Sequence, residues 1–381
     1  MPALAARVVY VANGANVGGG ARVLIQAMLG LAPRFTPHLV VPAEGTFSAW
    51  ASAHGVPWSL APHGGRNAIS GRAATYRNAL HLARVARGAA VIHAEAVTCY
   101  PPVGLVGRVL GIPRICHVQF PPSPGELTYA LRYGADLVLT VYRKQADEIR
   151  SDVRSDIPVL AVPNGIEVDH DVSTEDDPAA RALREDASHV AAIVAHVSEV
   201  KGYPTFLEAA ARVLTTYPHA LFLCAGGETT SQGYTDSMRR LARDLGISAR
   251  VRFLGAVADV RPVLRAADLF VLPSEQEGLP LAALEAMSCG RAVVSTPVNG
   301  VPEAVLDGAT GLLVPPRDPR RLADAIFALF ADAGRRNAMG QAGLRRVREH
   351  FEVNRVQRDL NTVYGALADG ARGTALSEAR C

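Results

Sequence analysis

The chain has 381 residues, of which 49% are hydrophobic and 20% are charged, and its formal net charge is +3. Because a single hydrophobic core stops growing at roughly 250–300 residues, this length favours two domains. The composition excludes a mainly disordered chain, and the small net charge gives no indication of nucleic-acid binding.

The spacing of the cysteines and the lengths of the apolar runs together indicate where the protein resides. The apolar run after Arg7 is shorter than the roughly 7–15 residues of a signal-peptide core, and no run approaches the roughly 18 residues of a membrane span. We therefore expect a cytoplasmic location. The five cysteines have no CxxC or metal-ligand spacing; they are Cys99, Cys116, Cys224, Cys289 and Cys381.

Short β-branched runs alternate with stretches of helical period in the first half of the chain. This alternation is typical of a parallel sheet with crossover helices. Helices are expected at 21–31 and 73–87. Strands are expected at 7–11, 38–41, 90–93, 114–118, 137–141 and 159–162.

A glycine-rich loop follows the first of these strands, at 13–20, and it contains Gly18 and Gly19. Glycines let the backbone approach a phosphate or a sugar closely. The spacing is not GxGxxG, and no acidic residue ends the second strand, so a dinucleotide site is poorly supported. Further along, His93 and His117 stand at strand ends, where either a role in the site or a structural role is open.

An acidic, polar run at 167–188 is interpreted as a surface linker, because the strand pattern restarts after it. We expect an α/β chain with two facing Rossmann-like, doubly wound domains and a ligand site in the cleft between them. The domains are 1–166, joined by the tail from about 355 to 381, and 167–354. Strands of the second domain are expected at 190–196, 221–225, 251–254, 269–272, 292–295 and 312–314, and a last helix at 356–367.

The segment 194–202 contains the end of the first expected strand of the second domain and finishes with the pair Lys201-Gly202. An ammonium at the carboxyl end of a strand can meet a diphosphate. Lys144 and Lys201 are the two lysines of the chain, which favours a specific use. A surface lysine is the alternative.

The segment 273–290 is the most informative part of the sequence about the function. A helix is expected from Pro280 to about Cys289, since proline suits the first helical position. The N–H groups of Gly278 and Leu279 would then lie beside a helix N-terminus, which favours an anion. Glu277 in the loop and Glu285 in the helix could bind hydroxyl groups of the same ligand. A solvated acidic loop before an ordinary helix is the alternative.

These two segments resemble the signature of the retaining GT-B glycosyltransferases of group 1, the GT4-type family. That signature has Glu, seven residues and Glu, as in Glu277 and Glu285, and a Lys-Gly pair, as in Lys201-Gly202. The chain departs from the family where His196 stands in place of an arginine and where Ala21 stands in place of the glutamate of a Gly-Gly-x-Glu loop.

The resemblance implies transfer of a sugar from a UDP- or GDP-sugar to a hydroxyl acceptor, with retention by same-face displacement and without a cofactor or metal. Glu277 would contact the donor sugar, Glu285 the ribose and His117 the region of the reacting carbon. The implied catalytic residues are His117, Lys201 and Glu277, and the implied donor-binding residues are Gly18, Gly19, His196, Gly278, Leu279 and Glu285.

Two other functions stay open: a nucleotide-sugar epimerase of the same architecture, and a two-lobed sugar-binding protein without catalysis. The acceptor could be a glycan, a glycolipid or a small molecule. A set of arginines could contact an anionic membrane or a lipid-linked acceptor, or form a solvated helix face. These are Arg66, Arg72, Arg77, Arg84 and Arg87.

Overall fold

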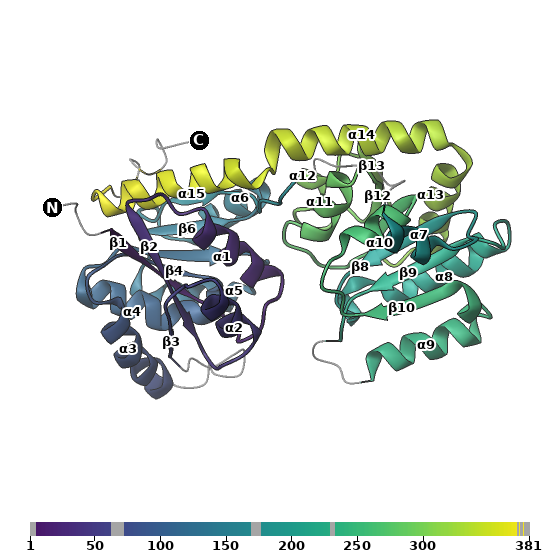
Figure 1. Ribbon diagram of the computed structural model, residues 1–381. Helices are drawn as coiled ribbons and strands as arrows, with labels where there is room; N and C mark the ends of the chain where they lie inside the picture. Colours follow the sequence, from purple (N-terminus) through teal and green to yellow (C-terminus); the bar gives the residue numbers. More distant parts are fainter. Residues whose placement is uncertain are drawn as a thin grey trace. The chain divides into compact units, whose positions relative to one another are not determined.

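The computed structural model describes residues 5–61, 72–168, 177–228 and 233–371 together with Gly373 and Leu376, without the side chains of residues 72–75, 77 and 124. It forms two compact units (Figure 1), which are Met1–Gly165 with Val353–Cys381, and Ile166–Glu352. Several predicted features lie outside the described residues: Arg66, Cys381, the acidic part of the linker at 169–176, and the side chains of Arg72 and Arg77.

The first unit contains a seven-stranded parallel sheet in the order β3-β2-β1-β4-β5-β6-β7. Its central strands are buried on both faces, which explains why they are nearly continuous apolar runs in the sequence. The strands are β1 Ala6–Val11, β2 Phe35–Val41, β3 Trp58–Leu60, β4 Ala89–Ala94, β5 Arg114–Val118, β6 Leu137–Thr140 and β7 Val159–Ala161.

Helices cover both faces of this sheet. One face packs against α3, α4, α5 and α6, and the other packs against α1, α2 and the C-terminal helix α15. Figure 1 shows α15, in yellow, lying along the first unit although it follows the second unit in the sequence. The helices are α1 Gly19–Leu29, α2 Thr46–Ala53, α3 Arg72–Ala86, α4 Tyr100–Leu110, α5 Pro124–Ala130, α6 Arg143–Asp152 and α15 Val353–Ala368.

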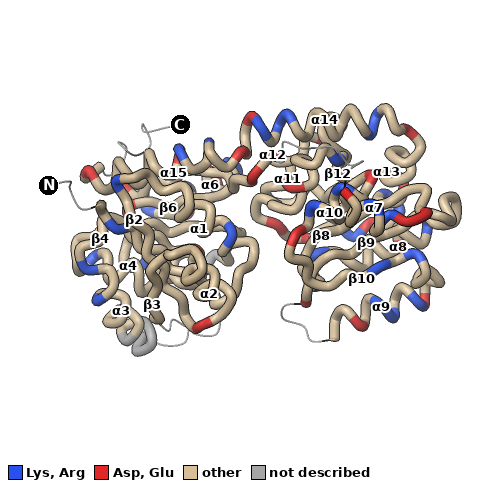
Figure 2. Tube along the Cα trace, viewed as in Figure 1, with Lys and Arg blue, Asp and Glu red and all other residues tan. Residues whose placement is uncertain are grey.

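The second unit contains a six-stranded parallel sheet in the order β10-β9-β8-β11-β12-β13. The strands are β8 Val190–Val194, β9 Leu221–Ala225, β10 Val251–Gly255, β11 Leu269–Leu272, β12 Ala292–Ser295 and β13 Gly311–Leu313. The helices are α7 Pro178–Arg184, α8 Tyr203–Leu214, α9 Tyr234–Asp244, α10 Arg261–Ala266, α11 Leu281–Ser288, α12 Val301–Ala304, α13 Pro319–Ala331 and α14 Ala333–His350. Along α9 and α14, blue and red segments mark the charged residues (Figure 2).

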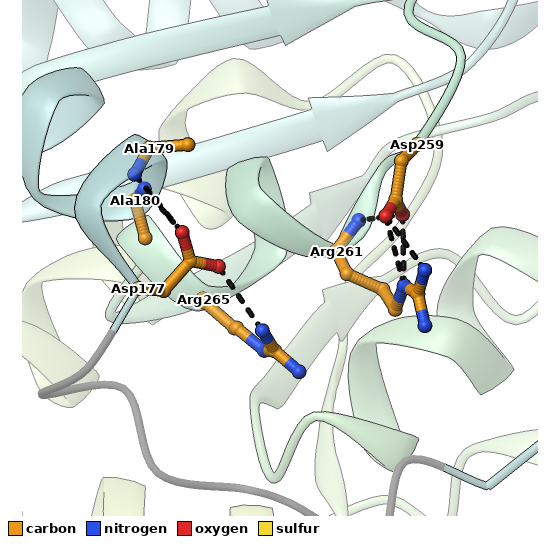
Figure 3. A network of polar contacts seen from close by, with 6 residues as sticks. All are labelled: Asp177, Ala179, Ala180, Asp259, Arg261 and Arg265. Carbon is orange, nitrogen blue, oxygen red and sulfur yellow. Dashed lines mark hydrogen bonds and ion pairs between the residues drawn. The ribbon is translucent and has the colours of Figure 1, made fainter.

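Helix α7 corrects the interpretation of 167–188 as a linker for the described residues from Asp177 onward, because α7 packs against the second sheet through Ala180. The Asp177 carboxylate caps α7 by accepting hydrogen bonds from the N–H groups of Ala179 and Ala180, each at 3.0 Å (Figure 3). Asp177 also pairs with Arg265 of α10 at 3.1 Å, and Ala180 is buried. The acidic residue that indicated a linker is therefore a helix cap.

The prediction of two doubly wound α/β sheets is confirmed. The edge strand β3 and helix α2 were not predicted, since each is short and has a weak periodicity. Among the described helices, none is both long enough and apolar enough to cross a membrane.

Each sheet reverses its strand order at one point, where parallel sheets of this type bind ligands beyond the carboxyl ends of the strands. In the first unit the reversal lies between β1 and β4, and in the second between β8 and β11. The loops that follow these four strands are therefore where a site is expected in each unit.

Candidate functional site

Lys201 is held at the reversal point of the second sheet by the backbone around it. It ends the short 3-10 turn Glu199–Lys201 between β8 and α8. Gly202 follows with a φ of +70°, and a Cβ at this position would lie 2.0 Å from the Pro273 carbonyl oxygen at the end of β11. A glycine is required here both for the left-handed backbone and for this close approach. Lys201 therefore lies beside the loop that follows β11.

Lys201 and Glu277 form an ion pair. The Lys201 Nζ donates a hydrogen bond to the Glu277 Oε1 at 2.7 Å, and the two side chains are 16% and 6% exposed. The same two loops are also joined through the backbone, because the Glu275 N–H donates to the Val200 carbonyl at 2.8 Å. The structure thus brings together two of the predicted catalytic residues.

A third loop, between β12 and α12, supports the backbone on either side of Glu277. The Glu277 N–H donates to the Asn299 Oδ1 at 3.1 Å, and the Gly300 N–H donates to the Gly278 carbonyl at 3.1 Å. Asn299 adopts a φ of +47°, which asparagine tolerates better than most residues. Sequence reasoning missed Asn299, although an Asn-Gly pair in the loop after a buried strand is a recognisable turn signal.

Helix α11 begins at Leu281, and Pro280 is its N-cap, so the helix starts one residue later than the first helical position predicted for Pro280. The segment with Gly278 and Leu279 leads directly into this helix, and both residues are buried. Among the described residues, none accepts a hydrogen bond from the Gly278 N–H. Glu285 lies in the helix and is half-buried.

His196 lies beyond the end of β8 and is exposed. Its backbone position is fixed by Ala195, whose carbonyl accepts a hydrogen bond from the Tyr203 hydroxyl at 2.8 Å. A Cβ on the neighbouring Gly226 would lie 1.8 Å from the same carbonyl oxygen. His196 therefore presents its ring to solvent from a rigid segment.

In the first unit, Gly18 is the N-cap of α1 and Gly19 is its first residue. A Cβ on either glycine would meet no atom within 4 Å. The space on the Cβ side of Gly18 and Gly19 is therefore not filled by any of the described residues.

His117 is buried on the face of the first sheet that α1 and α15 cover. Its Nδ1 lies 3.1 Å from the His93 Nε2, and the His93 Nδ1 lies 2.7 Å from the Tyr364 hydroxyl of α15. Burial lowers the pKa of His117 to about 4 and the pKa of His93 well below its usual value. Both rings are therefore neutral near pH 7, and the His117 Nε2 has no hydrogen-bond partner among the described residues.

A polar cluster that sequence reasoning missed lies at the reversal point of the first sheet. The Glu95 Oε2 accepts a hydrogen bond from the Asn13 N–H at 2.7 Å, and the Gln119 Nε2 donates to the Glu95 carbonyl oxygen at 3.2 Å. Glu95 is 9% exposed, and burial raises its pKa to about 7. The positions of Glu95 and Gln119 directly after β4 and β5 are a signal that could have identified them.

The site residues thus fall into two sets, one in each unit. Lys201, Glu277 and Gly278 lie together in the second unit, with Leu279 and Glu285 on the same segment. His117 lies in the first unit beside His93 rather than beside an ion pair. In the part of the chain that the structure describes, no group of three or more His, Cys, Asp or Glu residues could hold a metal ion.

Residues 188–332 match the family model described as Glycosyl transferases group 1. The chain is 34% identical over 214 residues to D-inositol 3-phosphate glycosyltransferase of Corynebacterium jeikeium (strain K411). The aligned region covers 54% of this chain and 51% of that protein. The protein of the same name from Geodermatophilus obscurus is 35% identical over 236 residues, covering 60% and 51%. The chain spans about half the length of these curated relatives.

The fold is shared with solved structures of low sequence identity. Anabaena HepE in complex with UDP-glucose has a TM-score of 0.82 at 19% identity, covering 94% of this chain and 99% of that one. Sucrose-phosphate synthase from Thermosynechococcus elongatus has a TM-score of 0.78 at 20% identity, covering 96% and 100%.

Proposed function

Since this chain belongs to the family of glycosyl transferases group 1, we propose that it transfers a sugar from a nucleoside-diphosphate sugar to a hydroxyl acceptor. The ion pair between Lys201 and Glu277 carries this proposal. It places a cation and a carboxylate within one hydrogen bond at the point of the second sheet where a ligand is expected.

The second unit is the donor-binding unit in this proposal. The Lys201 ammonium and the N–H groups of Gly278 and Leu279 bind the diphosphate, because both kinds of group favour an anion beside a helix N-terminus. Glu277 accepts hydroxyl hydrogen bonds from the donor sugar, and Glu285 does so from the ribose. His196 adds a solvated hydrogen-bond donor near the diphosphate.

The first unit is the acceptor-side unit. The space above Gly18 and Gly19 admits a ligand, and the His117 Nε2 has no partner among the described residues. Because burial keeps His117 neutral, the ring offers a ligand a hydrogen bond rather than a positive charge.

The proposed chemistry is same-face displacement with retention. The bond between the anomeric carbon and the diphosphate oxygen breaks, the acceptor oxygen attacks from the same face, and the leaving phosphate takes the acceptor proton. Lys201 and the backbone N–H groups stabilise the charge that develops on the diphosphate. Glu277 is held by Lys201 and by the Asn299 loop, so it is positioned before the donor binds.

UDP-glucose is the first donor to test, because the HepE structure with a similar fold contains it. D-inositol 3-phosphate is the first acceptor to test, because the curated relatives are named for it. GDP-mannose and a lipid-linked acceptor are the next pair to test. In the alternative with a membrane-bound acceptor, the exposed Arg84 of α3 would contact the anionic membrane surface.

Release of the nucleoside diphosphate, measured with and without acceptor, tests this function. Lys201→Ala and Glu277→Ala should each lower turnover at least roughly tenfold, a barrier change of about 1.4 kcal/mol. Lys144→Ala is the matched control, because this lysine is 72% exposed and pairs with Glu148 on the surface of α6.

The outcomes separate the alternatives. Conversion of the donor sugar without acceptor, followed by NMR, would indicate an epimerase. Donor binding without any release of nucleoside diphosphate would indicate a binding protein. Wild-type turnover in both the Lys201→Ala and the Glu277→Ala variants would contradict the proposed site.

A further inference from the structure

Glu95 is a buried carboxylate that the proposed donor site does not use. It follows β4 at the reversal point of the first sheet and is 9% exposed. No lysine or arginine among the described residues forms an ion pair with it. A buried carboxylate without a cation is unfavourable unless other donors bind it, so its surroundings decide what it does.

The two carboxylate oxygens of Glu95 have different surroundings. Oε2 accepts the hydrogen bond from the Asn13 N–H at 2.7 Å, whereas Oε1 has no hydrogen-bond partner among the described residues. Asn13 is itself held by the Thr98 hydroxyl, which donates to its side-chain oxygen at 2.5 Å. One oxygen is therefore fixed by the protein, and the other is available to a donor from outside it.

Gly20 provides the space for the free oxygen. A Cβ at Gly20 would lie 2.4 Å from the Glu95 Oε1 and 3.1 Å from the Gln119 Oε1. Gly20 lies inside α1, where alanine is ordinarily preferred over glycine by roughly 0.5–1 kcal/mol. The glycine thus keeps open the place that the carboxylate occupies, beside the open space above Gly18 and Gly19.

We propose that Glu95 binds a hydroxyl group of the acceptor through its Oε1, with Asn13 and Gly20 fixing the carboxylate for that contact. The ligand class is a neutral polyhydroxy group, such as the ring of a sugar or a cyclitol. An anionic group is disfavoured at this position because it would face a carboxylate. The proposal rests on the proposed glycosyl transfer, for which it names an acceptor contact.

The environment of Glu95 agrees with a ligand that donates hydrogen bonds. The groups around it are the Asn13 backbone, Thr98, Gln119, the Cys99 thiol and α1 at Gly20. Of these, the Asn13 N–H is the one that donates to the carboxylate. Burial raises the pKa of Glu95 to about 7, so the ionised form lacks stabilisation that a bound hydroxyl would supply.

The test uses the full chain with UDP-glucose or GDP-mannose and a panel of acceptors: myo-inositol, D-inositol 3-phosphate, glucose and fructose 6-phosphate. The acceptor that gives the fastest release of nucleoside diphosphate is then used for all variants. Glu95→Gln keeps the shape and the hydrogen bond from Asn13 but weakens the contact with a hydroxyl. It should raise the acceptor KM at least roughly tenfold while the affinity for UDP stays that of the wild type.

Gly20→Ala tests the same contact without changing the carboxylate. The added Cβ must displace the Glu95 Oε1, so this variant should raise the acceptor KM as Glu95→Gln does. Gly125→Ala is the matched control, because Gly125 is the second residue of α5 as Gly20 is of α1, a Cβ there would meet nothing within 4 Å, and the φ is not positive.

The outcomes keep the two proposals apart. An acceptor KM that stays within about twofold of wild type in both Glu95→Gln and Gly20→Ala would overturn the role of Glu95 and leave the transferase intact. Absence of nucleoside diphosphate release with every donor and acceptor would overturn the transferase and with it this contact. A loss of UDP affinity in Glu95→Gln would show a structural role and would also overturn the proposal.

Discussion

The Lys201 ammonium donates a hydrogen bond to the Glu277 carboxylate at 2.7 Å, across two loops that follow different strands of one sheet. The carboxylate is the more buried partner, at 6% exposed against 16% for the lysine side chain. The pair therefore holds both groups in place before a ligand binds. It also means that the two residues cannot be replaced independently without a cost to the fold.

We predict that Lys201→Met destabilises the ligand-free protein more than Glu277→Gln does. Removing the cation leaves a buried charge without a partner, which costs about 3–5 kcal/mol. Removing the carboxylate leaves an ammonium that water can reach, so the cost should be roughly 1–2 kcal/mol. Urea denaturation of both variants and of the double variant measures this. An equal loss in both, or a double variant that loses the sum of the two, would contradict the prediction.

Asn299 should stabilise the site in two separate ways, through the hydrogen bond of its side chain to Glu277 and through its tolerance of a positive φ. Asn299→Ala loses the hydrogen bond to the Glu277 N–H and strains a left-handed residue, so we expect a loss of about 1–3 kcal/mol. Asn299→Gly relieves the strain but not the loss of the hydrogen bond. Both variants should raise the donor KM, and Asn299→Gly should be the more stable of the two. Equal stability in thermal unfolding would show that the positive φ carries no strain.

The buried histidines predict acid sensitivity of the first unit. The pKa of His117 is about 4 in the folded chain and 6.5 in an unfolded one, so the unfolded state binds more protons between these values. The stability is fully present above pH 6.5 and is lost as the pH falls toward 4, by about 3 kcal/mol at most. His93 acts in the same direction, because burial lowers its pKa as well.

Denaturation measured between pH 7.5 and pH 4 checks this prediction. His117→Asn keeps a polar group near the position of Nδ1 and removes the titration, so its stability should fall less steeply with acid than that of the wild type. His81→Asn is the control, because His81 is exposed on α3. A wild-type slope in His117→Asn would contradict the account of the His117 pKa.

The two doubly wound sheets and the candidates Lys201 and Glu277 could be predicted from the sequence, whereas the strand order and the ion pair between these residues come from the structure. Buried parallel strands are continuous apolar runs, and Lys201 and Glu277 lie in the loops that follow two such runs. Their neighbours needed the structure. Asn299 reaches Glu277 from another loop, and Gly20 makes room for Glu95 from a helix. Such contacts depend on how elements pack rather than on spacing along the chain.

The histidines illustrate the same limit. The sequence places His93 and His117 at strand ends, but their environment is set by Tyr364, which is 271 residues from His93 in the chain. The interpretation of residues 177–188 as part of a linker was wrong, because Asp177 is acidic like a linker residue in composition but caps a helix in the structure. Local sequence patterns suggested the candidate residues, and tertiary packing decided what each one touches.

Calorimetric titration of UDP into the full chain tests the central claim most directly, because the chain has two lysines and only one of them is placed at the site. The wild type and Lys144→Met should bind UDP with the same affinity, and Lys201→Met should bind it at least roughly tenfold more weakly, about 1.4 kcal/mol. A folded Lys201→Met protein that binds UDP as tightly as the wild type would contradict the account of a diphosphate held by Lys201.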